Sequence, residues 1–280
     1  MEDNQLEILR QRAESGDVAA MCEIGRRCYH SGDYEECVKW YRAAAEQGNS
    51  WGQVTLAAAY IEGKGVEQNF EEGAKWSHLA AEQGNVYGYI NLGCIYEWGE
   101  NYEEAFRLYN LISENYVAAY RLGILYYNGL GVTQNFEEAE RCFRRAAEQG
   151  MENAQCGLGV LYEFGRGVEQ SDTEAAKWYR KAAEQGFAEA QWRLGHCYYA
   201  GVGVDVDYEE SAKWLQLAAW QGLAKAQYGL GILYEEGRGV EQSNTEAAKW
   251  YRKAAEQGDT LIHLPQSGLP NSIMRPNIVP

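Results

Sequence analysis

Histidine and cysteine are the residues of this chain with the most versatile chemistry, because both ligate metals and both act in nucleophilic catalysis. The four histidines are His30, His78, His196 and His263. None of them has the i, i+4 partner that metal sites on helices use. The seven cysteines form no Cys-x-x-Cys pair, so the sequence predicts no metal site. We expect reduced thiols that pack as small hydrophobes, as in a reducing compartment.

Residue groupings typical of enzymes are also missing from the linear sequence. No Ser/His/Asp or Cys/His grouping is visible from the spacing, and no Ser-x-x-Lys motif occurs. Distant residues can converge in a repetitive fold, so an enzyme stays open as the less favoured alternative. The pattern favours a chain with no catalytic residues and no cofactor.

Two recurring features resemble binding or catalytic motifs but favour a structural role. Gly-x-Gly-Val segments occur at residues 63–66, 129–132, 165–168, 201–204 and 237–240. Glycine amides at a helix start can bind phosphate, yet no Lys-Ser/Thr follows these segments and no strand precedes them. Pairs of glutamates such as Glu71-Glu72 recur where a helix is expected to begin, and there negative charge favours the helix dipole. We interpret both features as structural.

A repeat organises these features along the chain of 280 residues. The sequence AAEQG, complete or with one substitution, occurs at residues 44–48, 80–84, 146–150, 182–186, 218–222 and 254–258. Most neighbouring copies are 36 residues apart, which is typical of a solenoid of stacked units. We divide the chain into seven units: residues 17–48, 49–84, 85–114, 115–150, 151–186, 187–222 and 223–258.

Each unit has the pattern of two helices joined by a glycine loop. In the unit at residues 151–186, apolar residues at helical spacing predict a first helix around residues 153–162. Ser171 stands three residues before Glu174, the spacing of a capping box, and predicts the start of a second helix that ends at Gly186. Between them, Val168 is expected to fill the gap between the helices. The predicted fold is an all-α, right-handed α-solenoid of about seven antiparallel helix pairs.

The residues of a unit read Ala-x-x-x-Leu-Gly-x-x-Tyr-x-x-Gly-x-Gly-Val and then Ala-x-x-Trp-Tyr-x-x-Ala-Ala-x-x-Gly, and this pattern resembles the Sel-1-like repeat, a relative of the tetratricopeptide repeat. The resemblance covers about residues 17–258. Two single residues depart from the pattern, because Cys28 replaces a tyrosine and Ala57 replaces a glycine. The third unit departs more widely, because it lacks the glycine loop. The third unit also has Phe106 at the tryptophan position and Glu114 at the terminal glycine, so we expect a local change of curvature there. The resemblance implies a protein-binding scaffold.

Charge and hydropathy limit the partners. The formal net charge of −16 disfavours nucleic acid, because phosphate binding needs a stripe of Lys and Arg. No stretch approaches 18 uninterrupted apolar residues and no signal sequence opens the chain, so we expect an acidic cytoplasmic protein with no membrane contact. The oligomeric state stays open.

Positions where the repeats disagree indicate the candidate binding surface. Tetratricopeptide-like solenoids line their concave groove with residues of the first helix of each pair. The predicted groove residues are Trp51, Tyr87, Trp98, Tyr120, Tyr127, Phe164, Trp192, His196, Tyr199 and Tyr228. Aromatic residues dominate binding hot spots, which favours a scaffold or adaptor that binds a protein or peptide. Packing between adjacent helices is the alternative role for these aromatics. An inhibitor or immunity-type protein that blocks one basic partner is the alternative function.

The two ends differ from the repeats. Residues 1–16 resemble a second helix without its first, and Leu6 and Leu9 are expected to cap the first unit. All four prolines fall in residues 259–280, which predicts a partly disordered tail. Leu261, Ile262 and Leu264 are expected to cover the last unit before those prolines.

Overall fold

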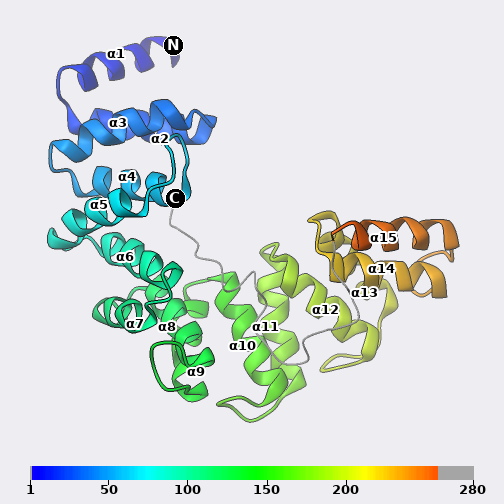
Figure 1. The fold of residues 1–280 in the computed structure, drawn as a ribbon. Helices are drawn as coiled ribbons and strands as arrows, with labels where there is room; N and C mark the ends of the chain where they lie inside the picture. The colour runs from blue at the N-terminus through cyan, green and yellow to red at the C-terminus, as the bar shows by residue number, and fades with distance from the viewer. Residues whose placement is uncertain (1, 258–280) are drawn as a thin grey trace. The chain divides into compact units, whose positions relative to one another are not determined.

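The computed structural model describes residues 2–257, and the expectations for residues 258–280, including the capping role of Leu261, Ile262 and Leu264, lie outside them (Figure 1). Every regular element in the described part is an α-helix. The helices are α1 (Glu2–Glu14), α2 (Val18–Ser31), α3 (Tyr34–Glu46), α4 (Ser50–Glu62), α5 (Phe70–Glu82), α6 (Val86–Trp98), α7 (Tyr102–Leu111), α8 (Tyr116–Asn128), α9 (Phe136–Glu148), α10 (Glu152–Phe164), α11 (Asp172–Glu184), α12 (Ala188–Ala200), α13 (Tyr208–Trp220), α14 (Ala224–Glu236) and α15 (Asn244–Glu256).

These helices form seven consecutive pairs after α1, which confirms the predicted all-α solenoid. We call the even-numbered member of each pair helix A and the odd-numbered member helix B. The chain divides into two compact units, the first over residues 2–118 with 130–132, and the second over residues 119–129 with 133–257. Within each unit, successive helices pack on their sequence neighbours, as expected when each repeat buries its apolar face on the next.

A glycine near the middle of helix A lets helix B approach closely. Opposite Gly159 lies the ring of Tyr179, and a Cβ at this glycine would collide with the ring. The second pair differs at both members of this contact: Ala57 replaces the glycine and the small Ser77 replaces the aromatic residue. The departure noted in the sequence is therefore compensated across the helix pair.

The Gly-x-Gly loops are structural turns, as predicted. Both glycines have positive φ, for example 69° at Gly63 and 71° at Gly65, a conformation that favours glycine. The second glycine also lies directly against the backbone of the preceding helix B; at Gly65 the neighbour is the carbonyl of Tyr34. A side chain has no space there, so the loop glycine joins one repeat to the next. Val168 is partly buried and packs against the apolar core of the second unit.

A chain of glutamines ties consecutive repeats together and explains the recurring AEQG. In the second unit, Gln191 of α12 donates to the carbonyl of Ala183 at the end of α11, with a distance of 3.2 Å. Its side-chain oxygen accepts a 2.8 Å hydrogen bond from Gln221, which follows α13. The same pair of bonds recurs at Gln53, Gln155 and Gln227. Each of α4, α10, α12 and α14 is thus bonded to the helix B on either side of it.

Each helix B has at least one acidic residue in its first turn, although the capping box at Ser171 is only half formed. The Ser171 hydroxyl accepts from the backbone amide of Glu174, as a capping box requires. The Glu174 carboxylate instead pairs with Lys177 one turn later, at 2.6 Å. Gly186 ends this repeat with φ 94°, the left-handed conformation expected for it.

The third pair is the irregular one, as its sequence indicated. The turn between α6 and α7 has no Gly-x-Gly, and Glu100 takes φ 58°, the one positive φ among the described non-glycine residues. Helix α7 has 10 residues, whereas the other B helices have 13. The boundary between the two compact units follows directly, near the start of α8.

The N-terminal helix α1 packs against the first pair. Leu9 packs on the core formed by α2 and α3, and Ala13 is fully buried there. Capping of the first unit by residues 1–16 stays a prediction; Leu9 makes the contact that this role requires, and Leu6 lies half-buried.

Candidate functional site

Most of the predicted groove residues share one side of helix A. We call this side the helix-A face and define it, in each unit separately, by helix-A positions 2, 5, 9, 12 and 13. The predicted residues on it that reach the surface are Trp51, Trp98, Phe164, His196 and Tyr228, and Tyr87, Trp192 and Tyr199 are half-buried. Trp51, Trp98, Phe164 and Tyr228 keep 38%, 40%, 37% and 43% of their surface exposed. The exposed part of each of these four rings is available to contact a partner.

Two of the predicted groove residues are core residues, and their assignment as surface anchors needs correction. Tyr120 is 1% exposed and Tyr127 is 3% exposed. Both lie in the main apolar cluster of the second unit, where Tyr120 packs on the Phe143 ring at 5.9 Å. The alternative role, packing between helices, applies to these two.

In the first unit the surface aromatics form two edge-to-face pairs. Trp51 of α4 meets Tyr87 of α6, with ring centroids 5.7 Å apart, and Trp98 of α6 meets Phe70 of α5 at 4.9 Å. Edge-to-face contact is the preferred geometry for such rings. The pairs fix the orientation of each tryptophan and leave part of its surface open.

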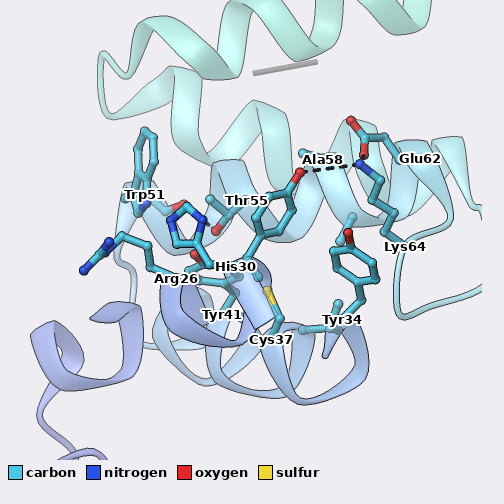
Figure 2. Close-up of a pocket in the computed structure, with 13 residues that line it drawn as sticks. Arg26, His30, Tyr34, Cys37, Tyr41, Trp51, Thr55, Ala58, Glu62 and Lys64 are labelled. Atoms are coloured by element: carbon cyan, nitrogen blue, oxygen red, sulfur yellow. Dashed lines mark hydrogen bonds and ion pairs between the residues drawn. The ribbon is translucent and has the colours of Figure 1, made fainter. Parts of the chain in front are cut away.

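The first unit also contains a pocket between α2, α3 and α4, with a volume of about 240 Å³. Its walls come from the first two repeats, with Tyr29, Tyr34 and Trp51 as rings and Val38 and Ala59 as apolar floor. Figure 2 shows Arg26 and His30 beside Trp51 at one end, and Glu62 with Lys64 at the other.

At one end of the pocket lies Lys64, a cation of the loop after α4, and its contacts fix this end. The Lys64 ammonium lies 2.6 Å from Glu62 and donates to the Tyr29 hydroxyl at 3.4 Å. It also lies over the rings of Tyr29 and Tyr34, at 5.6 and 5.8 Å from the centroids. The hydrogen bond to Glu62 raises the pKa of Lys64 and keeps it charged. This end is therefore internally neutralised and rigid.

Neither the thiol nor the most buried hydroxyl of the pocket is activated as a nucleophile. Cys37 is the thiol of the pocket, and burial raises its pKa to about 12. Burial likewise raises the pKa of the Tyr41 hydroxyl. Both groups are protonated at neutral pH, and a thiol reacts as a nucleophile only when ionised. The pocket thus offers shape and charge for binding.

In the second unit, Trp192 lies between two cations on the helix-A face. Arg193 is 5.4 Å and Lys225 4.9 Å from its ring centroid. Both cations pair with the buried carboxylate of Glu189, Arg193 at 3.3 Å and Lys225 at 3.9 Å. The arrangement fixes the indole across two neighbouring A helices.

Arg193 continues this network toward the preceding repeat. It donates to Glu163 at 3.0 Å, and Glu163 also accepts from the Tyr179 hydroxyl. Burial by itself would lower the pKa of Arg193, but the carboxylates of Glu189 and Glu163 beside it raise this pKa overall. Burial raises the pKa of Tyr179, so it stays protonated and donates. The network is a charged connection between three A helices.

Loop cations recur in the second unit. Arg238 lies 5.7 and 5.1 Å from the rings of Tyr199 and Tyr208 and donates to the Tyr199 hydroxyl at 3.2 Å. Arg166 lies in the same way over Tyr127, and also over the exposed Phe164 at 5.3 Å. These contacts orient residues at the edge of the helix-A face.

Sequence reasoning missed the pocket and the buried ion network. The signal for the pocket was present: Ala59 stands where other A helices have Leu125, Leu161 and Leu233. Glu189 carried no comparable signal, because an isolated glutamate on a helix is normally solvated. Among residues 2–257, no cluster of three His, Cys, Asp or Glu side chains could hold a metal ion. None of the helices described is both long and apolar enough to cross a membrane.

The repeat geometry agrees with a known family. The Sel1 repeat model matches the chain seven times, over residues 18–49, 52–85, 86–115, 117–151, 153–187, 188–223 and 224–259. The chain belongs to the Sel1 repeat family. Sel1 repeat proteins generally mediate protein–protein interactions. A search of the curated proteins finds no match.

Solved structures support this assignment. A protective antigen of uropathogenic Escherichia coli that displays an SLR fold is 35% identical, with a TM-score of 0.73 over 91% of this chain and 56% of that one. The chain thus spans little more than half of that relative. A Sel1 repeat protein from Oxalobacter formigenes is 31% identical, with a TM-score of 0.73 and coverage of 92% and 78%. An immunity protein from Pseudomonas aeruginosa, 21% identical with a TM-score of 0.50 over 79% and 89%, shares the fold alone.

Proposed function

We propose that this chain is a non-catalytic scaffold or adaptor that binds a protein or peptide partner on the helix-A face. The observation that carries the proposal is the exposure of Trp51, Trp98, Phe164 and Tyr228 on that face. Tryptophan and tyrosine supply large contact areas at low entropic cost and dominate interface hot spots. The neighbouring cations and rings restrain these side chains before binding, which lowers the cost of ordering them.

Charge and thiol chemistry support further parts of the proposal. The net charge of −16 favours association with basic proteins over long range and disfavours nucleic acid. All seven cysteines are unpaired, which supports action in a reducing, cytoplasmic environment.

The test is affinity capture with paired variants of the full chain. Trp51→Ala/Trp98→Ala removes the exposed anchors of the first unit, and Phe164→Ala/Tyr228→Ala removes those of the second. Trp220→Ala is the matched control, because Trp220 is 66% exposed on the B helix α13. Circular dichroism checks that each variant is folded.

We expect one of the paired variants to lose a partner that the wild type and Trp220→Ala both retain. Removing two hot-spot aromatics should weaken binding by several hundredfold, on the order of 10²–10³, since each costs about 2 kcal/mol or more. Identical capture by the wild type, both paired variants and the control would show that the helix-A aromatics do not bind the partner.

A further inference from the structure

The pocket of the first unit lies where α4 carries small residues in place of the large ones of α8, α10 and α14. Ala59 corresponds to Leu125, Leu161 and Leu233, all of which are buried in the second unit. At the preceding position, Ala58 stands where α10 has Val160. Both alanines are half-buried and line the pocket.

Replacement of large buried residues by alanine lowers the stability of the folded state. A packed repeat that loses several methyl groups loses their burial and leaves unfilled space, which destabilises the folded state. The rest of the wall does not collapse into this space: Lys64 is held by Glu62 and Tyr29, and Trp51 is held by Tyr87. A pocket maintained by fixed walls is suited to an occupant from outside the chain.

The size of the pocket limits the occupant. Small-molecule and cofactor sites usually enclose about 300–1,000 Å³. A volume of about 240 Å³ is below that range. One large side chain of a partner protein suits this volume, and the apolar floor with its aromatic walls favours an apolar or aromatic side chain.

The Arg26 end of the pocket has an excess of positive charge in a chain that is otherwise acidic. Glu23 accepts from both Arg26, at 3.0 and 2.8 Å, and Arg27, at 2.8 Å, so one carboxylate faces two guanidinium groups. His30 lines the same end of the pocket. A partner carboxylate beside Arg26 and His30 would balance this charge, and guanidinium groups match carboxylates well.

We propose that this pocket receives one large apolar or aromatic side chain of the partner protein, with an acidic group next to it that contacts Arg26 and His30. The proposal rests on the proposed function, because it assigns one contact of the same partner. It also names the specificity: the pocket selects side-chain size through Ala58 and Ala59, and selects charge through Arg26.

The experiment measures binding of defined probes to the full chain by saturation-transfer NMR and titration. The probes are N-acetylphenylalanine, its uncharged amide, and N-acetylalanine. Ala59→Leu introduces the residue that α8, α10 and α14 have at this position and fills the pocket, while Arg26→Gln removes the charge and keeps the pocket open. Trp220→Ala, on α13, is the control.

We expect N-acetylphenylalanine to bind the wild type and Trp220→Ala more tightly than its amide, and N-acetylalanine to bind neither measurably. Ala59→Leu should weaken the binding of N-acetylphenylalanine by about tenfold or more, because the leucine excludes the aromatic side chain from the pocket. Arg26→Gln should make the acid and the amide bind equally.

Equal binding of N-acetylphenylalanine to the wild type and Ala59→Leu overturns the proposal, as does the absence of saturable binding to the wild type. If Ala59→Leu does not fold, the Arg26→Gln comparison decides, because an unchanged preference for the acid also overturns it. Probe binding requires no partner, so its failure is distinct from failure of the proposed function, which the paired aromatic variants test.

Discussion

The glutamine chain predicts a specific stability loss when one member is replaced. Gln191 is buried and makes two side-chain hydrogen bonds, to the Ala183 carbonyl and from Gln221. Gln191→Leu keeps most of the volume and removes both bonds. Two neutral hydrogen bonds contribute about 1–3 kcal/mol together.

Other hydrogen bonds of the two partner groups place the expected loss of stability in the lower part of this range. The Ala183 carbonyl still accepts from the Gly186 amide at 3.0 Å, and the Gln221 amide still donates to the Gly186 carbonyl at 2.8 Å. Neither partner is left unsatisfied, and the leucine side chain adds apolar burial. We therefore expect Gln191→Leu to lower the free energy of unfolding by about 1–2 kcal/mol, in the lower part of the range.

Urea unfolding followed by circular dichroism measures the loss, and amide hydrogen exchange in α12 localises it within the array. A double-mutant cycle with Gln221→Ala isolates the bond between the two glutamines, for which we expect a coupling of about 0.5–1 kcal/mol. Unchanged or increased stability of Gln191→Leu, or a cycle that closes without coupling, would refute a stabilising role for the glutamine chain.

Three further outcomes follow from the structure. Gly65→Ala should destabilise the chain by at least about 1 kcal/mol more than Gly84→Ala in urea unfolding, because both have positive φ but only Gly65 lies against backbone; equal losses would contradict this. Burial raises the pKa of Cys197 to about 12, whereas the unfolded thiol titrates near about 8.5. The unfolded state then binds fewer protons between those values, so stability falls as pH rises through that window, and Cys197→Ala should reduce the slope by up to about 1.4 kcal/mol per pH unit; an unchanged slope would argue against it. Arg238→Val should lower the free energy of unfolding by about 1 kcal/mol, because it removes the contacts with Tyr199 and introduces the residue that the preceding loop has at this position, Val202. A larger loss of stability in Arg238→Val than in Arg166→Val would argue against this.

The helices of the fold were predictable because the same capping residues and glycines recur from one repeat to the next. Helix starts are marked by capping residues such as Ser171, and helix ends by glycines such as Gly186. The irregular third pair was also recognisable, since it lacks the loop glycines. Repetition turns a weak local signal into a strong one.

The candidate site was only partly predictable, because helical spacing gives the side of a helix and not the depth of a side chain. Tyr120 and Trp192 share position 5 of their helices, yet Tyr120 packs into the core and Trp192 lies half-buried between Arg193 and Lys225. The difference comes from the neighbouring helices, which no single segment encodes.

Residues that depart from the repeat pattern are of two kinds. Some are compensated by a second change in the same helix pair, and others leave open space beside them. Ala57 departs from the family glycine, but Ser77 departs at the facing position of the same helix pair, and the two changes restore packing. Ala59 departs from the usual leucine and the space beside it stays open as the pocket. A departure that the fold compensates maintains the solenoid, whereas one left uncompensated lowers its stability and leaves open space that an occupant from outside the chain can use. By this reasoning Ala59→Leu should raise the stability of the chain by up to about 2 kcal/mol, at about 0.8 kcal/mol for each added buried carbon, while it closes the pocket. Thermal unfolding of the full chain tests the first effect, and a destabilised Ala59→Leu would show that the pocket walls are already packed as tightly as they can be.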